Sequence, residues 1–169
     1  MAEKDWTDAL LERLAATRPR KEVEPYQVTA RIARIGLHIA RLQDEAFGRF
    51  GLNRGEVGVL GALLHAGSAR LSPTQLFKGL MLSSAGITSR LDRLERAGYV
   101  KRSRHPEDRR GVLVSITEAG RKVFEQAVAA DLDGEIGVLA PLTRADQRIL
   151  VSLLRKMLGG LEPESPTAG

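Results

Sequence analysis

The sequence predicts a mainly helical fold with one small β-hairpin, and two observations carry this prediction. Apolar residues recur at spacings of three and four along several stretches, which is the period of helices with one buried face. Between Tyr99 and Thr117 this period gives way to a strand-like alternation on both sides of a charged turn. A hydrophobic content of 43% over 169 residues suffices for one domain with its own core.

The N-terminal segment 1–25 is predicted to combine an extra helix with a linker. The helix spans residues 5–16, and its apolar side carries Trp6, Leu10, Leu11 and Leu14. Residues 17–25 contain two prolines and many charges, so we expect a linker there. Trp6 has two interpretations. It is either a packing anchor that docks this helix or a wall of a ligand pocket.

Two helices are predicted next. The first is long and amphipathic, and its apolar stripe consists of Val28, Ile32, Ile35, Ile39, Leu42 and Ala46. The second starts at Asn53, where an N-cap is followed three residues later by Glu56 in a capping-box pattern. Gly67 is expected to end it.

A pair of short helices follows. Ser72, Pro73 and Gln75 form a strong start signal for a helix that ends near Gly79. After a turn over residues 80–83, Ser84 is expected to cap the next helix. Its apolar stripe is Ile87, Leu91 and Leu94, with Arg90, Arg93 and Arg96 off the stripe and solvated.

The hairpin and two further helices complete the chain. Strands are predicted over residues 99–104 and 112–117, joined by the charged turn 105–111. Thr117 and Glu118 start a helix that Pro141 ends. Thr143 and Asp146 start the last helix, whose apolar face is wide for a monomer. Residues 162–169 read as a disordered tail.

Positive charge is concentrated in the middle of the chain. From Ser83 to Gly111 there are eight Lys/Arg and four Asp/Glu residues, an excess of +4 out of the chain's +5. A local excess of this kind is typical of a surface that binds nucleic acid. On charge alone, a solvated basic helix and hairpin remains the alternative.

Other classes of protein find little support in the sequence. There are no cysteines, which excludes disulfides, Cys–Zn sites and thiol redox sensing. His38, His65 and His105 lie at no metal-ligand spacing, and phosphate-loop and nucleophile-elbow patterns are missing. We therefore expect neither enzyme activity, nor a cofactor, nor a metal. The absence of a bilayer-length apolar run and of a secretory signal predicts a cytoplasmic protein without membrane contact.

The central motifs resemble a known family. The segment L-D-R-L-E-R-A-G-Y-V-K-R, followed by H-P-E-D-R-R-G-V-L-V-S-I-T-E-A-G, is similar to the winged helix-turn-helix of MarR-family transcription regulators. The resemblance implies one domain over residues 26–161, with a DNA-binding lobe at about 53–118 and dimerisation helices at both ends. It further implies a homodimer that binds a pseudo-palindromic operator, more often as a repressor, and is released by a small-molecule effector.

The resemblance also assigns residues to DNA. The recognition helix would present towards the major groove Ser84, Gly86, Thr88, Ser89, Arg90 and Arg93. The wing would contribute Asp108, Arg109 and Arg110, with Arg110 entering the minor groove and Asp108 positioning the wing arginines. His105 stands where relatives usually carry an acid. A protein-interaction module without DNA binding is the alternative function, but it would not need this basic face.

Two residues are similar to the effector site of a urate-responsive branch of the family. They are Trp6, on the extra helix, and Arg90. The acid that completes the pocket in that branch aligns with Gly58, which carries no charge. The resemblance of Trp6 and Arg90 to that site implies a ligand between the dimer helices and the DNA-binding lobe. A different aromatic or anionic metabolite is at least as good a candidate as urate.

Overall fold

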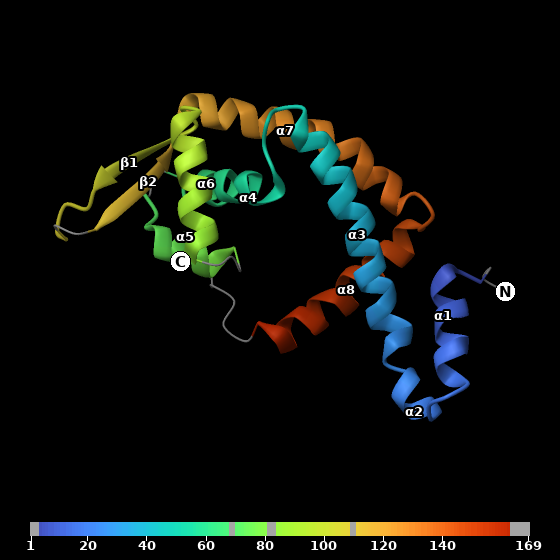
Figure 1. Ribbon diagram of the computed structural model, residues 1–169. Coiled ribbons are helices and arrows are strands. Elements are labelled where there is room, and N and C mark those ends of the chain that lie inside the picture. The colour runs from blue at the N-terminus through green and yellow to red at the C-terminus, as the bar shows by residue number, and fades with distance from the viewer. Residues whose placement is uncertain (1–3, 68–69, 81–83, 109–110, 163–169) are drawn as a thin grey trace. The chain divides into compact units, whose positions relative to one another are not determined.

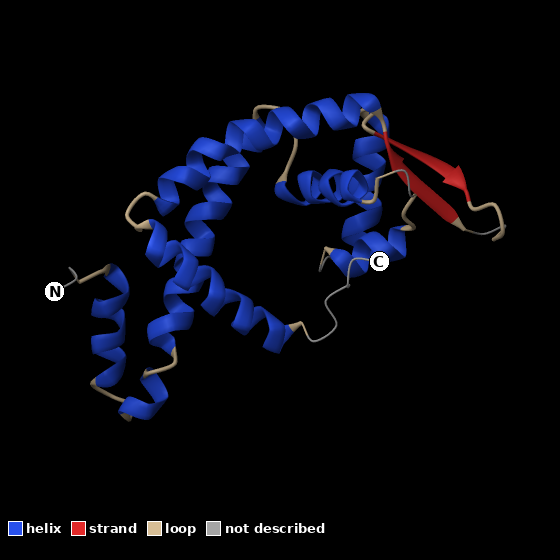
Figure 2. Cartoon of the chain, turned by 180° about the vertical axis from the view of Figure 1, so that it is seen from behind, coloured by secondary structure: helices blue, strands red, loops and turns tan. Residues whose placement is uncertain are grey.

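The computed structural model describes residues 4–67, 70–80, 84–108 and 111–162, and it confirms a mainly helical fold with one small hairpin (Figures 1 and 2). The described elements are, in chain order, α1 (Trp6–Ala15), α2 (Arg20–Val23), α3 (Tyr26–Gly48), α4 (Arg54–His65), α5 (Pro73–Gly79), α6 (Ser84–Arg96), β1 (Val100–Arg104), β2 (Val112–Ile116), α7 (Glu118–Leu139) and α8 (Arg144–Leu161). The chain divides into two compact units, Met1–Leu42 and Gln43–Gly169. The predicted disordered tail lies outside the described residues, except for Glu162.

The first unit differs from the sequence prediction at two points. The buried side of α1 is formed by Thr7 and Leu11, whereas Trp6 is 59% exposed. The prediction that Trp6 shares a packed face with Leu11 is therefore wrong. The predicted linker also contains α2, which begins directly after Pro19. Proline at this position has its φ already fixed near the helical value, and Arg20, Lys21 and Glu22 all favour a helix.

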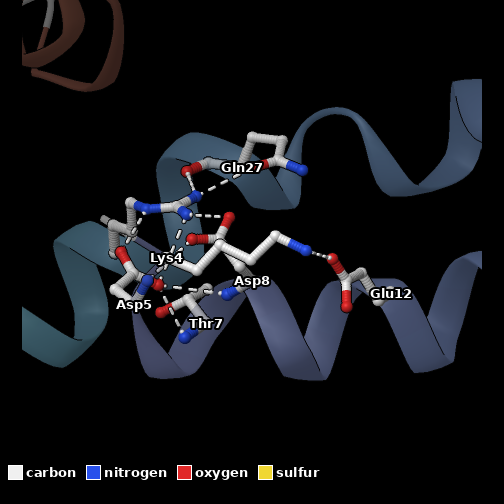
Figure 3. Close-up of polar contacts among 7 residues, drawn as sticks. Lys4, Asp5, Thr7, Asp8, Glu12 and Gln27 are labelled. Atoms are coloured by element: carbon white, nitrogen blue, oxygen red, sulfur yellow. Dashed lines mark hydrogen bonds and ion pairs between the residues drawn. The ribbon is translucent and has the colours of Figure 1, made fainter. Parts of the chain in front are cut away.

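Arg31 of α3 holds the start of α1 within this unit. The two acids that it contacts, Asp5 and Asp8, lie together at the start of α1 (Figure 3). Its Nε donates to Asp5 Oδ2 at 2.8 Å, and its Nη2 donates to Asp8 Oδ1 at 2.6 Å. Desolvation raises the pKa of the Asp5 carboxyl, but hydrogen bonds from Arg31 and from the N–H groups of Asp8 and Thr7 outweigh it, so the pKa is lowered. Asp5 also caps α1 in a capping box with Asp8. One carboxyl group thus serves both the helix cap and the contact between helices.

The second unit has a core built from every element between the end of α3 and the middle of α7. The predicted stripe of α6 is confirmed, because Ile87, Leu91 and Leu94 are fully buried. They pack in a cluster that also includes Phe47, Leu60, Leu63, Leu76, Val100, Val114 and Val123. The predicted start signals of α4, α5, α7 and α8 are confirmed by side-chain hydrogen bonds to Asn53, Ser72, Thr117 and Thr143.

The hairpin extends from this core. β1 pairs antiparallel with β2, with Val100 opposite Ile116 and Arg104 opposite Val112. Leu71, in front of α5, adds a third strand-like contact, because its N–H and C=O both bond to Val114 at 3.0 and 2.8 Å. Short segments of this kind carry no periodicity, so the sequence did not predict it. In Figure 1 the β1–β2 ribbon projects beyond helices α4, α5 and α6 of the same unit.

α8 is the least buried helix of the described chain for its length. None of its eighteen residues is buried, although half of its side chains are apolar. Its exposed apolar side chains are Ile149, Leu150, Val151, Leu153, Leu154, Met157, Leu158 and Leu161. Within the described ranges, no helix combines the length and hydropathy needed to span a bilayer.

Candidate nucleic-acid interface

α5 and α6 form the helix-turn-helix that the start signals predicted. Both helices pack on α4, and α6 also contacts β1, the first strand of the wing. Thr88 and Ser89, near the start of α6, are exposed, and Gly86 is half-buried. Ser84, which was predicted to cap this helix, is its first residue, and the position of the cap before it lies outside the described residues. Hydroxyl side chains at this end of a helix suit phosphate oxygens and base edges.

The two arginines predicted to read bases both lie against the start of α4. Arg90 Nη1 donates to the Gly86 carbonyl at 2.9 Å, and its Nε is buried without a hydrogen-bond partner among the described residues. A Cβ at Gly55 would lie 2.1 Å from that Nε, so only glycine leaves room for this arrangement. Arg93 Nε lies 2.9 Å from Oε1 of buried Glu56. The prediction of a solvated side chain is therefore wrong for Arg90, whereas Arg93 is exposed but paired.

The wing is tied to the recognition helix by a third arginine. Arg102 of β1 donates through Nη1 to Asp92 Oδ1 at 2.6 Å and to Glu95 Oε2 at 3.0 Å. The backbone N–H of Arg102 also donates to Glu95 Oε1 at 3.2 Å. Helix and wing are therefore held together by both side-chain and backbone bonds. In the sequence Arg102 counts only as positive charge, and only the fold brings it to the two acids.

His105 closes the turn at the described part of the wing. Its Nδ1 lies 3.2 Å from the N–H groups of both Glu107 and Asp108, which fits a neutral ring that accepts at Nδ1. A carboxylate often accepts the same pair of bonds in a turn. The imidazole thus accepts in this turn the two bonds that a carboxylate would accept. Asp108 is exposed beside this turn, and Arg109 and Arg110 lie outside the described residues.

The remaining basic side chains give the interface its charge. Arg96, Lys101 and Arg104 are exposed on α6 and β1, whereas Arg102 is compensated by its two acids. Positive potential is thus concentrated along α6 and the wing, where a polyanion would meet it. Among the described residues, no group of three or more His, Cys, Asp or Glu side chains could hold a metal ion.

Trp6, the first of the two predicted effector residues, lies in the first unit. The Arg34 guanidinium covers its ring at 4.3 Å from the centroid. The hollow beside Trp6 has a volume of only about 120 Å³. A larger cleft of about 520 Å³ lies between α1, α2 and the start of α3, but its lining includes Asp8, Glu12 and Glu24. Arg20 also lines this cleft, and Asp8 and Glu12 are paired with Arg31 and Lys4, so its lining carries charges of both signs.

Comparison with known proteins agrees with this geometry. A family model described as MarR family matches residues 50–111. The HTH-type transcriptional regulator PecS of Dickeya dadantii is 33% identical over 141 residues, which cover 83% of this chain and 85% of PecS. The HTH-type transcriptional repressor YetL of Bacillus subtilis is 32% identical over 71% of this chain and 70% of its own. The names of these relatives describe regulators of transcription rather than enzymes.

Solved structures give the same result. A mutant of MarR from Escherichia coli, crystallised with operator DNA, has a TM-score of 0.72 at 29% identity and covers 84% of this chain and 99% of that one. The DNA binding of Bordetella bronchiseptica BpsR is regulated by 6-hydroxynicotinic acid. Its structure has a TM-score of 0.69 at 27% identity, and the match covers 78% of this chain and 98% of that one. Both similarities cover almost the whole neighbouring chain.

Proposed function

The chain belongs to the MarR family, and on that premise we propose that it is a sequence-specific regulator of transcription that binds double-stranded DNA. The observation that carries this proposal is the exposed start of α6 next to a basic wing that Arg102 fixes to the same helix. A helix of this kind fits the major groove, and a wing reaches the adjacent minor groove. The operator complex of the Escherichia coli relative supports this mode of binding.

Each proposed contact has a distinct role. Ser84, Gly86, Thr88 and Ser89 would approach phosphates and base edges at the start of α6. Arg110 would enter the minor groove, with Arg109 beside it and Asp108 positioning both. Arg90 and Arg93 stay in the proposed interface, but their contacts with α4 favour a role at its inner edge.

We further propose that the active form is a homodimer. The exposed apolar stripe of α8 supports it, because burying that stripe against a second copy removes apolar surface from water. Two recognition helices about one turn of DNA apart, roughly 34 Å, would then read a pseudo-palindromic operator. Such a dimer would act in the cytoplasm, at the nucleoid while bound to DNA.

Binding to selected DNA tests the proposal directly. The full chain would select duplexes from a random library, and footprinting would examine its own upstream region. We expect one selected sequence to bind far more tightly than a scrambled duplex, with affinity falling steeply as salt increases. Arg110→Ala should weaken binding and reduce the salt slope by about 1, because one cation is removed from the DNA surface. Arg144→Ala removes the same charge from exposed α8 and should leave binding unchanged. Failure to select any sequence would leave the protein-interaction alternative standing.

We propose repression relieved by a small molecule as the mode of regulation. YetL is named a repressor, and the DNA binding of BpsR is regulated by an aromatic carboxylic acid. Arg90 is the proposed anion contact here, because its buried Nε–H has no acceptor within the described residues. An effector releases DNA only by binding the DNA-free form better than the DNA-bound form. Gly58 supplies no acid, which makes urate a weaker candidate than an aromatic carboxylate.

Substitution of Trp6 separates its two proposed roles, with ligand-driven release of DNA as the measurement. Urate and 6-hydroxynicotinate would be titrated onto the protein with and without its selected operator. We expect the carboxylate to release DNA at lower concentration than urate. Trp6→Phe should leave that release unchanged, because Arg34 already covers the ring. Loss of release in this variant would instead place Trp6 in the effector site, and release by micromolar urate would contradict the inference from Gly58.

A further inference from the structure

The start of α4 receives both arginines from the inner side of the recognition helix. Arg90 lies across Gly55, and Arg93 reaches Glu56 one residue further along. Arg93 Nη2 also donates to the Gly51 carbonyl at 3.4 Å. Gly51 has a φ of +68°, a left-handed conformation that turns the chain between α3 and α4. Groups at the start of α4 and in the turn before it therefore contact two consecutive turns of α6.

Glu56 has two roles in this arrangement, one for each carboxylate oxygen. Oε2 accepts the N–H of Asn53 at 3.0 Å and completes the capping box of α4. Oε1 lies 2.9 Å from Arg93 Nε, but the N–H direction is unsuited to a hydrogen bond, so the contact is an ion pair. The Glu56 side chain is 1% exposed, whereas that of Arg93 is 54% exposed. The acid is thus fixed in the protein interior, and the arginine bridges from it to the surface.

A buried carboxylate needs a compensating cation, because its desolvation is otherwise unfavourable. In the described chain, Arg93 is the residue paired with Glu56. Glu56 cannot follow a moving partner, since its other oxygen is held by the Asn53 cap. Rotation or sliding of α6 along α4 would therefore separate the ion pair. The pair favours one orientation of the recognition helix over neighbouring ones.

We propose that Glu56 is a positioning residue of the DNA interface: through Arg93 it sets the orientation in which α6 is presented to DNA. This inference rests on the proposed function. It assigns to Arg93 the role of a link to α4 and leaves sequence reading to the exposed start of α6. Specific binding requires this orientation, whereas non-specific binding depends mainly on charge. The Glu56–Arg93 ion pair is therefore expected to raise the affinity for the operator relative to the affinity for non-specific DNA.

The test compares Glu56→Gln, Arg93→Ala and the double variant of the full chain. Affinities are measured for the selected operator duplex and for a scrambled duplex of equal length. Glutamine keeps an acceptor for the Asn53 N–H but loses the charge that holds Arg93. We expect E56Q to bind the operator roughly tenfold more weakly, within the usual range for one coupled pair, without weaker binding to the scrambled duplex. The double variant should bind the operator no more weakly than R93A alone.

Controls separate positioning from charge and from folding. Glu125→Gln changes the net charge equally on the exposed surface of α7, and it should bind both duplexes like the wild type. Arg93→Lys keeps the charge at an exposed site but cannot span Glu56 and Gly51 together, so it should also lose specificity even if E56Q folds poorly. Wild-type operator affinity in E56Q or R93K would overturn the inference. So would a double variant whose loss of operator affinity equals the product of the losses in E56Q and R93A, because the two residues would then act independently. A wild-type protein that selects no DNA would instead overturn the proposed function.

Discussion

Leu153→Glu is expected to turn the proposed dimer into monomers and, with it, to abolish tight operator binding. Leu153 is 56% exposed on the apolar stripe of α8, so the substitution disturbs the protomer's own packing little. In a dimer, each copy would lose the burial of one leucine, about 1.5–3 kcal/mol, and would place a carboxylate in an apolar contact. Since both copies change, we expect the dimer Kd to rise at least roughly a hundredfold.

Light scattering and sedimentation at micromolar concentration measure the assembly, and band shifts measure binding to the operator. Ser152→Glu is the matched control, because it adds the same charge at the preceding residue, outside the apolar stripe. We expect this variant to stay dimeric. A Leu153→Glu protein that remains dimeric would show that the stripe of α8 is not the interface.

Gly120→Ala is expected to destabilise the DNA-binding unit strongly. Gly120 is buried in the first turn of α7, and a Cβ there would lie 2.1 Å from the Tyr99 carbonyl oxygen and 2.9 Å from Ile116 Cγ1. The Tyr99 carbonyl belongs to the backbone and accepts the Thr117 N–H at 3.0 Å, so it cannot move without opening the junction of wing and helix. We expect the free energy of unfolding to fall by about 1–3 kcal/mol or more, as in overpacked cores.

Gly137→Ala provides the comparison on the same helix. Apart from neighbouring residues and the backbone of α7 itself, no atom of the described chain lies within 4 Å of the position that a Cβ would take at Gly137, so the change should be neutral or stabilise by about 0.5–1 kcal/mol. Urea denaturation followed by circular dichroism measures both variants. Equal stability of the two would mean that the junction near Tyr99 adapts to the extra methyl group.

Local signals in the sequence determined where most elements begin and end. Asn53, Ser72, Thr117 and Thr143 were predicted as helix starts, and each accepts the expected backbone N–H. A cap is a hydrogen bond between residues two or three positions apart, so it does not depend on how distant parts of the chain pack. The apolar stripe of α6 was also predictable, since helical geometry alone places Ile87, Leu91 and Leu94 on one side. The excess of Lys and Arg between Ser83 and Gly111 was enough to predict that the basic surface lies on α6 and the wing.

The tertiary structure decided which partner each long side chain takes. Arg93 pairs with Glu56, and Arg102 with Asp92 and Glu95, only because α4, α6 and β1 pack together. Arginine side chains are long and can reach several acids, so sequence spacing does not choose among them. The same holds for Trp6, whose ring lies under Arg34 although helical spacing placed it beside Leu11. Local preferences are fixed by the backbone within a few residues, whereas these contacts depend on elements that only folding brings together.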